Sequence, residues 1–374
     1  MCCGARGVRG HAVAQWWGVI VRRWAPAVGG LAAAVLGLAG CGDAPLWDQA
    51  AGFVDYKDSG KILAVDDGVE LSRHTGQVAG DDDYALFDVG VAAAGETWTF
   101  MVHTPAGSPR LFTIAVYDAE YDLLQRVRRA SGVELRHTMR RATGRVYAAV
   151  MAECDGAVEF ELVTTHLPAG DTPEPRAQVV WLDYTGARAI AIADQPAVSF
   201  GPFHAADLGP QYADATEVIK AEITRTVRAL YAGYAVTIIS SDEAAAPPGP
   251  HSTIYFGGYN PDLVGMGAGV DRYNADPSDD AIVYTRSFTS YAVMDLSPED
   301  MGRMVGNTAA HELGHLLGLF HTRGADQLMD DARSAWDLAA VSKLGRAPLA
   351  ETVFPFGVED APTVLAQTVG LAGD

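Results

Sequence analysis

Three histidines and one glutamate in the last quarter of the chain have the spacing of a hydrolytic metal site. His311 and His315 are four residues apart, so on a helix both imidazoles point to the same side and can bind one ion. Glu312 lies beside them, where a base for a metal-activated water is needed. Gly318 can end the helix in a left-handed conformation, and the reversed chain then brings His321 close as a third ligand. The pattern predicts metal-assisted hydrolysis.

The residues before this motif predict the helix that carries it. Ser297 can cap a helix, and Pro298 suits its first turn. Glu299 and Asp300 then place negative charge at the positive end of the helix dipole. A helix is therefore expected to begin at this point and to run without a break into His311.

Strands alternate with helices upstream of this helix, which is typical of an α/β domain with one sheet. A helix is expected at 216–231, where apolar residues recur at helical spacing. Strands are expected over 179–184, 236–239, 253–256 and 281–284. The long stretch 257–280 is predicted to be irregular, and such stretches are usually functional or ion-bound.

The string H-E-x-x-H-x-x-G-x-x-H, from His311 to His321, resembles the signature of the metzincin zinc endopeptidases. The resemblance covers residues 178–345. Met329 matches the methionine turn that these enzymes place beneath the metal. The family fold implies a mixed sheet, a long zinc-binding helix and a final helix, here expected over 331–344. Thr322 is similar to the corresponding residue of pappalysins and some matrixins, but the subfamily stays unassigned.

The resemblance also implies a mechanism. His311, His315 and His321 would hold Zn²⁺, and Glu312 would take a proton from the activated water and pass it to the leaving amine. Protein or peptide substrates would lie extended along the strand over 281–284, which is expected at the edge of the sheet. The segment 330–336 would form the wall of the pocket after the cleaved bond.

Alternation with a period of two dominates residues 59–166. Apolar and polar residues alternate over 98–102, 112–116, 146–150 and 158–162, which predicts an antiparallel β-sandwich. The segments YALFDV, TWTFMV and VEFELV are similar to pre-peptidase sandwich domains of secreted bacterial proteases. The expected fold class is therefore α+β with two domains. A proline-rich linker over 167–177 joins the sandwich to a catalytic domain over 178–345, and a tail over 346–374 follows, either docked or flexible.

Residues 1–40 contain arginines but no acid, end in an apolar run, and are predicted to be a lipoprotein signal peptide. Leu38-Ala39-Gly40-Cys41 resembles the bacterial lipobox, so Cys41 is expected to carry acyl chains that anchor the protein, with 41–58 as a tether. The expected location is a bacterial membrane, preferably the outer membrane or the cell surface. Only Cys154 then remains in the body, so no internal disulfide is expected.

Charge and composition limit the classes of molecule that the protein is expected to bind. The 374 residues include 27 Lys and Arg against 47 Asp and Glu, and the net charge of −20 repels phosphate backbones, which excludes a general nucleic-acid binder. Asp81, Asp82 and Asp83 offer hard oxygen ligands, so Ca²⁺ is a second candidate cofactor. Three adjacent acids are, however, more often a solvated turn.

Two other functions compete with peptidase activity. One is a catalytically inactive zinc-binding adhesin or binding module on a protease fold. Glu312 argues against it, because a structural zinc site has no use for a carboxylate that is not a ligand. The other assigns the main function to the sandwich, as a binder of glycan or protein. A cluster of exposed aromatic side chains would favour that role, whereas the alternation places most aromatic residues in a core.

Overall fold

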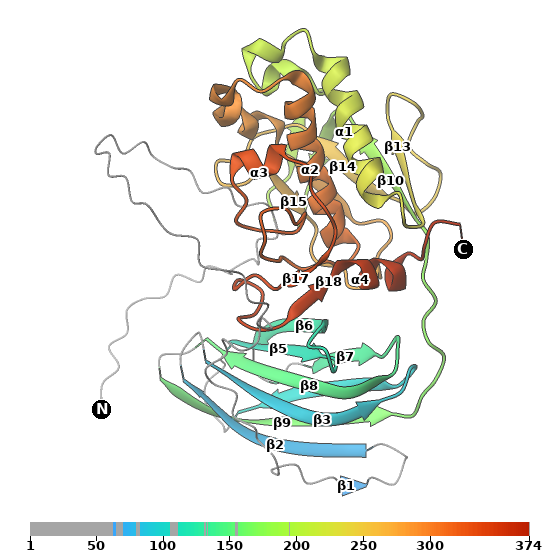
Figure 1. The fold of residues 1–374 in the computed structure, drawn as a ribbon, viewed down its shortest axis with the longest axis vertical. Coiled ribbons are helices and arrows are strands. Elements are labelled where there is room, and N and C mark those ends of the chain that lie inside the picture. The colour runs from blue at the N-terminus through green and yellow to red at the C-terminus, as the bar shows by residue number, and fades with distance from the viewer. Residues whose placement is uncertain are drawn as a thin grey trace, which may run out of the picture.

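The computed structural model describes residues 63–64, 70–79, 83–104, 111–130, 132, 134–153, 156–193 and 195–373. The predicted signal peptide, tether and lipidated Cys41 lie outside these residues, as do Asp81, Asp82 and Cys154. The described chain has a mixed α+β fold made mostly of sheets, which confirms the expected class. In Figure 1 the strands of the N-terminal part, residues 63–167, lie below, and the C-terminal part, residues 178–373, lies above.

Two antiparallel sheets make up the N-terminal part. Their strand orders are β1-β2-β9-β4-β7 and β3-β8-β5-β6. The strands are β1 (Leu63–Ala64), β2 (Glu70–Ala79), β3 (Tyr84–Ala92), β4 (Thr97–His103), β5 (Leu111–Tyr117), β6 (Leu123–Ala130), β7 (Glu134–Thr138), β8 (Thr143–Ala152) and β9 (Ala157–Leu167). The four strands predicted from alternation are confirmed as β4, β5, β8 and β9.

An apolar core lies between these two sheets, because successive side chains of a strand point to opposite faces. Trp98 and Phe100 of β4 are buried, and the residues between them are partly exposed. Phe160 of β9 meets Phe87 of β3 with ring centroids 6.0 Å apart and Phe112 of β5 at 6.1 Å. These three rings join the inner faces of both sheets in one cluster.

A five-stranded mixed sheet with the order β13-β10-β14-β16-β15 forms the centre of the C-terminal part. Its strands are β10 (Gln178–Asp183), β13 (Val236–Ser240), β14 (Ser252–Phe256), β15 (Gly265–Gly267) and β16 (Asp280–Val283), and the sheet shares a core with helices α1 (Thr216–Tyr231) and α2 (Pro298–Leu316). The smaller elements are β11 (Ala187–Ile190), β12 (Val198–Phe200) and the 3-10 helices η1 (Ala205–Asp207), η2 (Pro210–Tyr212) and η3 (Thr285–Met294). The predicted strands and helix of this part are confirmed within two residues at each end.

The expectation that 281–284 lies at the edge of the sheet is wrong. These residues belong to β16, and β15 pairs with it in antiparallel fashion, with Met266 opposite Ile282. β15 is the last strand in the order and lies inside the stretch 257–280 that was predicted to be irregular. With glycine at both ends of three residues, β15 shows no alternation of side chains from which a strand could be predicted.

The helix predicted over 331–344 is much shorter, since α3 spans only Ala335–Ala339. Beyond it the backbone pairs with the segment around the methionine turn. The N–H of Leu328 donates to the carbonyl of Lys343 at 2.8 Å, and the N–H of Lys343 donates to Asp326 at 3.0 Å. These hydrogen bonds replace the next helical turns.

The last residues of the chain are docked rather than free. β17 (Arg346–Pro348) pairs with β18 (Val358–Asp360), and α4 (Ala361–Thr368) follows directly. Val364 and Leu365 of α4 are buried in the same core as α1 and α2. This segment is therefore structurally part of the α/β unit.

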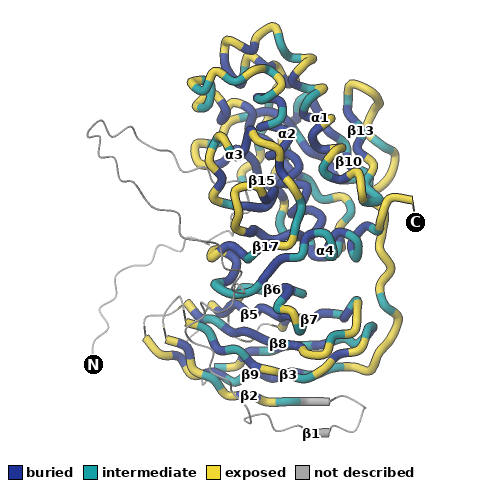
Figure 2. Tube along the Cα trace, in the orientation of Figure 1, coloured by how far each residue is buried: buried dark blue, intermediate teal, exposed yellow. Residues whose placement is uncertain are grey.

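The N-terminal and C-terminal parts share a buried junction. A third apolar cluster joins Tyr117 of β5 to Phe354 in the segment between β17 and β18. Beside it, Arg272 and Glu359 form a buried ion pair with Nη1 and Oε1 2.6 Å apart. Arg272 also donates from Nε to the carbonyl of Leu124 in the N-terminal part, at 3.0 Å. Figure 2 shows buried backbone where β17 and α4 lie between the two parts.

Candidate metal centre

Helix α2 is held in place by its cap and by glycines. The hydroxyl of Ser297 accepts a hydrogen bond from the N–H of Asp300, so the helix begins where the sequence predicts. A Cβ at Gly302 would lie 2.8 Å from the Cβ of Glu222 on α1, and one at Gly306 would lie 2.8 Å from the Cβ of Thr226. Only glycine permits this close approach, which fixes the first half of α2, ahead of the motif.

The three predicted ligands meet at one point. The Nε2 atom of His321 lies 3.1 Å from that of His315 and 3.2 Å from that of His311. All three side chains are buried, with at most 4% of their surface exposed. Among the described residues they form the one group of His, Cys, Asp and Glu side chains suited to a metal ion.

Hydrogen bonds decide which nitrogens face the centre. Nδ1 of His311 donates to the carbonyl of Leu328 at 2.7 Å, and Nδ1 of His315 donates to Leu319 at 2.8 Å. With the proton on Nδ1, the Nε2 atoms present lone pairs toward one another, which is unfavourable unless a cation lies between them. Tetrahedral zinc with Zn–N of about 2.0–2.1 Å needs ligand nitrogens about 3.3 Å apart. The donor set therefore fits Zn²⁺.

Burial keeps these imidazoles neutral. It lowers the pKa of His315 to about 4 and the pKa of His311 and His321 well below the ordinary value of 6.5. Repulsion between the neighbouring rings lowers the pKa of His311 and His321 further. Neutral imidazole is the form that binds a metal, so the site is ready for an ion at neutral pH.

The turn that delivers His321 requires Gly318. This residue has φ of +93°, and a Cβ there would lie 2.9 Å from the Cα of Arg272 and 3.0 Å from the carbonyl oxygen of Asp271. Arg272 donates from Nη1 to the carbonyl of Gly318 at 2.8 Å. The N–H of Asp271 donates to the backbone carbonyl of His315 at 3.0 Å. The loop around 272 thus packs directly on the ligand turn, which the sequence did not indicate.

Met329, which the resemblance identifies with the methionine turn, packs against helix α2 at Gly314. A Cβ at Gly314 would be 2.5 Å from the sulfur of Met329, so the glycine between His311 and His315 makes room for the thioether. The N–H of Thr322 donates to the carbonyl of Met329 at 2.8 Å. This bond ties the methionine segment to the residue after the third ligand.

Glu312 faces the edge strand β15. Its side chain is fully buried, and a Cβ at Gly265 would lie 2.5 Å from Oε1 of Glu312. Gly267 is also close, with a Cβ position 3.6 Å from Oε2. Gly265 and Gly267 leave β15 without a predictable alternation of side chains. The same two glycines let the strand lie against the carboxylate of Glu312.

The segment after Met329 contains both buried and exposed residues. Asp330 and Arg333 are buried, and Arg333 donates to the backbone carbonyl of Asp337. Trp336 of α3 is 64% exposed. The segment 330–336, predicted as the pocket wall, thus mixes two buried charged residues with exposed ones and ends in an exposed indole.

The predicted calcium residues are not brought together within the described part of the chain. Asp83 accepts a hydrogen bond from the N–H of Ala79 at 2.7 Å, which is a turn contact. Asp81 and Asp82 lie outside the described residues. Ca²⁺ remains a sequence-based expectation.

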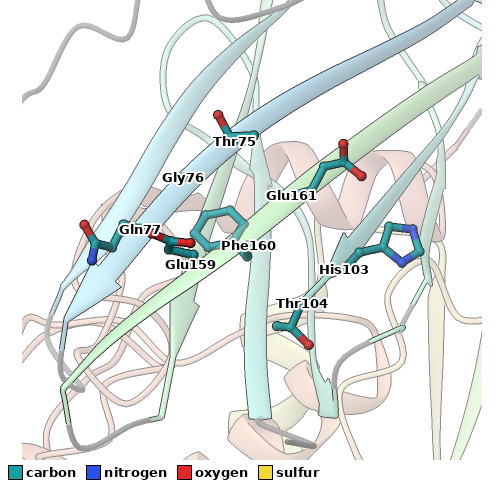
Figure 3. Close-up of a pocket in the computed structure, with 8 residues that line it drawn as sticks. All are labelled: Thr75, Gly76, Gln77, His103, Thr104, Glu159, Phe160 and Glu161. Atoms are coloured by element: carbon teal, nitrogen blue, oxygen red, sulfur yellow. The ribbon is translucent and has the colours of Figure 1, made fainter. Parts of the chain in front are cut away.

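The N-terminal part carries a shallow hollow of about 620 Å³ on β2, β4 and β9 (Figure 3). It is lined by Thr75, Gly76, Gln77, His103, Thr104, Glu159, Phe160 and Glu161. Its one Phe, Tyr or Trp residue is Phe160, which is 3% exposed and belongs to the core. Among the described residues of this part no large aromatic side chain is exposed, so the cluster that would favour glycan binding is absent from them.

Comparisons with known proteins add little. No protein-family model matches the chain, and no curated protein matches it. The chain is weakly similar to the Yersinia pseudotuberculosis-derived mitogen, with 12% identity, a TM-score of 0.22 and coverage of 27% of this chain and 89% of that one. The xylan-binding module CBM15 is 14% identical, with a TM-score of 0.21 and coverage of 31% of this chain and 100% of that one. TmCBM61 in complex with β-1,4-galactotriose is also 14% identical, with a TM-score of 0.20 and coverage of 29% of this chain and 88% of that one. TM-scores this low support no inference about function.

None of the helices within the described residues is long and apolar enough to cross a bilayer.

Proposed function

We propose that the protein is a zinc-dependent endopeptidase of the metzincin type. The observation that carries the proposal is that three imidazole Nε2 atoms meet, with that of His321 at 3.1 Å and 3.2 Å from the other two. The next residue after the first of these histidines is the buried Glu312. The sheet order with one antiparallel edge strand, and Met329 packed against α2 at Gly314, support the same family resemblance.

Zinc held by the three histidines would lower the pKa of a coordinated water towards about 7 and polarise a scissile carbonyl. Glu312, adjacent to His311 on the helix, accepts the proton of the attacking water at its carboxylate and donates it to the leaving amine. The carbonyls of Leu328 and Leu319 hold two imidazoles in the required orientation through Nδ1. The buried setting strengthens each of these electrostatic interactions.

The substrate main chain would pair with β15 rather than with β16. β15 is the outermost strand on the side of the sheet that faces Glu312, and an extended peptide can add to such an edge through main-chain hydrogen bonds. Pairing there would lay the scissile bond over the carboxylate. Exposed Trp336 would lie near the far end of this binding site, in the segment that follows Met329.

The test compares variants of the 42–374 fragment on an unfolded protein substrate, with and without a zinc chelator. Glu312→Ala should retain zinc and lose activity by about 10²–10⁴-fold, since it removes the general base. His315→Ala should lose both zinc and activity, whereas Glu299→Ala, an exposed glutamate on the same helix, should behave like the wild type. Cleavage by Glu312→Ala at the wild-type rate would refute the mechanism. Zinc binding without any cleavage by the wild type would favour an inactive binding module.

We further propose that the enzyme is exported and held at a bacterial membrane by acyl chains on Cys41. The support is the lipobox-like sequence at 38–41 after an apolar run. A lipid anchor of two or more chains would give stable attachment.

A further inference from the structure

A second pocket lies at the junction, away from the metal ligands. It has a volume of about 340 Å³ and is formed by β7, by the linker around 173–176, by the loop 272–275 and by Thr368 at the end of α4. Four segments that are distant in sequence meet there, so the pocket exists only when both parts of the chain are assembled.

The lining of this pocket is basic, although the whole chain has a net charge of −20. Arg136, Arg140 and Arg176 all contribute to it, and Glu174 is the one acidic residue in the lining. Arg272 also reaches the pocket, but Glu359 neutralises it. Within the described chain none of the first three arginines forms an ion pair, so their charge is available to a ligand.

Arg140 is held in a fixed position. Its Nη1 donates to the carbonyls of Pro173 at 3.0 Å and Gln367 at 2.8 Å, and its guanidinium lies 4.1 Å from the centroid of the Tyr273 ring. Arg136 and Arg176 are exposed at the opening. One fixed and two exposed guanidinium groups around a cavity suit the planar, bidentate recognition of an oxyanion.

Three buried polar atoms of the lining have no hydrogen-bond partner among the described residues. They are His137 at Nε2, Asn274 at Oδ1 and Thr368 at Oγ1, each with at most 4% of its surface exposed. Buried polar atoms are nearly always satisfied, and an exception indicates a bound water, ion or ligand. Three exceptions in the lining of one pocket point to an occupant.

The backbone of the pocket is strained in a way that fits this interpretation. Tyr273 and Asn274 both have positive φ, +70° and +51°. Consecutive non-glycine residues in this region are unfavourable and concentrate at ligand-binding positions. Burial, together with Arg272 and Arg140, lowers the pKa of His137 to about 3, so its neutral imidazole can donate or accept a hydrogen bond without adding charge.

We propose that this junction pocket is a binding site for a small oxyanion, a phosphate or a carboxylate group. Arg136, Arg140 and Arg176 supply the charge, and the buried His137 and Thr368 supply further hydrogen bonds. The proposal does not depend on peptidase activity, because it rests on residues outside the metal centre.

The experiment titrates the zinc-loaded full chain with inorganic phosphate and, separately, with acetate by calorimetry. The two probes distinguish a phosphate from a carboxylate site. The paired variant Arg136→Ala/Arg176→Ala should bind the preferred anion at least about tenfold more weakly, since each charge-assisted hydrogen bond is worth about 1.4 kcal/mol or more. The matched control is Arg129→Ala/Arg188→Ala, which removes the same charge from exposed positions outside the pocket.

A second measurement locates the anion. The imidazole NMR signals of His137 should shift as the anion saturates, and in the Arg136→Ala/Arg176→Ala variant the same shift should need an anion concentration at least about tenfold higher. Equal weakening by the control pair would show that general electrostatics, not the pocket, binds the anion. Failure of the wild type to bind either probe, or binding that leaves His137 unshifted, would overturn the proposal.

Discussion

Replacing Arg272 by methionine should strongly destabilise the protein, because this residue connects the two parts to the ligand turn. Its side chain is 2% exposed, and its Nη1 lies 2.6 Å from Oε1 of Glu359, which is fully buried. Arg272 also donates to the carbonyls of Leu124 at 3.0 Å and Gly318 at 2.8 Å and contacts the carbonyl of Leu123. Methionine fills a similar volume but satisfies none of these acceptors.

The expected magnitude follows from what the substitution leaves behind. Burial already raises the pKa of Glu359, and Arg272 opposes that shift. Without Arg272 the protein must bury an unpaired carboxylate or protonate it. Breaking a buried pair from one side typically costs about 3–5 kcal/mol, so we expect a loss of that size in the free energy of unfolding. The double variant Arg272→Met/Glu359→Gln removes the orphaned charge and should lose less than Arg272→Met alone.

Urea unfolding of the zinc-loaded 42–374 fragment measures these free energies. Arg145→Met is the matched control, because Arg145 pairs with Asp88 at 3.2 Å with both side chains largely exposed. Such exposed pairs are worth about 0–1 kcal/mol. A loss for Arg272→Met no larger than that of the control would refute the reasoning, as would a double variant that is less stable than the single one.

Three further predictions concern the metal centre and the anchor. Gly265→Ala should abolish cleavage while zinc stays bound, because its Cβ would lie 2.5 Å from Oε1 of Glu312; cleavage at the wild-type rate with zinc retained would contradict this. The metal-free protein should lose stability as the pH falls from 6.5 towards 4, since the pKa of His315 is lowered from 6.5 to about 4 and only the unfolded state gains the proton in that range. Urea midpoints of chelated protein at both ends of the range measure this, and equal midpoints would exclude it. Cys41→Ser should move the protein from the membrane to the soluble fraction on cell fractionation, and an unchanged distribution would reject the lipobox.

The parts of the fold that were predictable from the sequence depend on local spacing. Helix α1 has the predicted bounds because its apolar residues repeat every three to four positions. The cap at Ser297 and the motif from His311 to His321 likewise lie on one continuous stretch, so the ligand geometry needs no distant contact. The structure brings the three histidines together, and it places the Glu312 carboxylate against Gly265 of β15.

What could not be predicted depends on contacts between distant residues. β15 is a strand only because β16 pairs with it, and Gly265-Met266-Gly267 has no pattern of its own. Arg272 lies 148 positions from Leu124 and 87 from Glu359, so no local pattern shows that it is buried. The docking of α4 could not be predicted from sequence for the same reason. Its apolar residues predict that the helix is buried but do not indicate which surface it packs against.

The docked C-terminus sets the order in which the molecule can mature. Glu359 accepts a hydrogen bond from the N–H of Phe320 at 3.4 Å, next to the third ligand His321. Arg140 donates a hydrogen bond to the carbonyl of Gln367, which lies 227 positions later in the sequence. A chain synthesised or exported from its N-terminus acquires these partners last, and contacts of such long range form slowly. The contact of Glu359 beside His321 therefore forms only after residues 346–373 have been made, so we expect a chain that stops short of Glu359 to hold its third ligand less firmly.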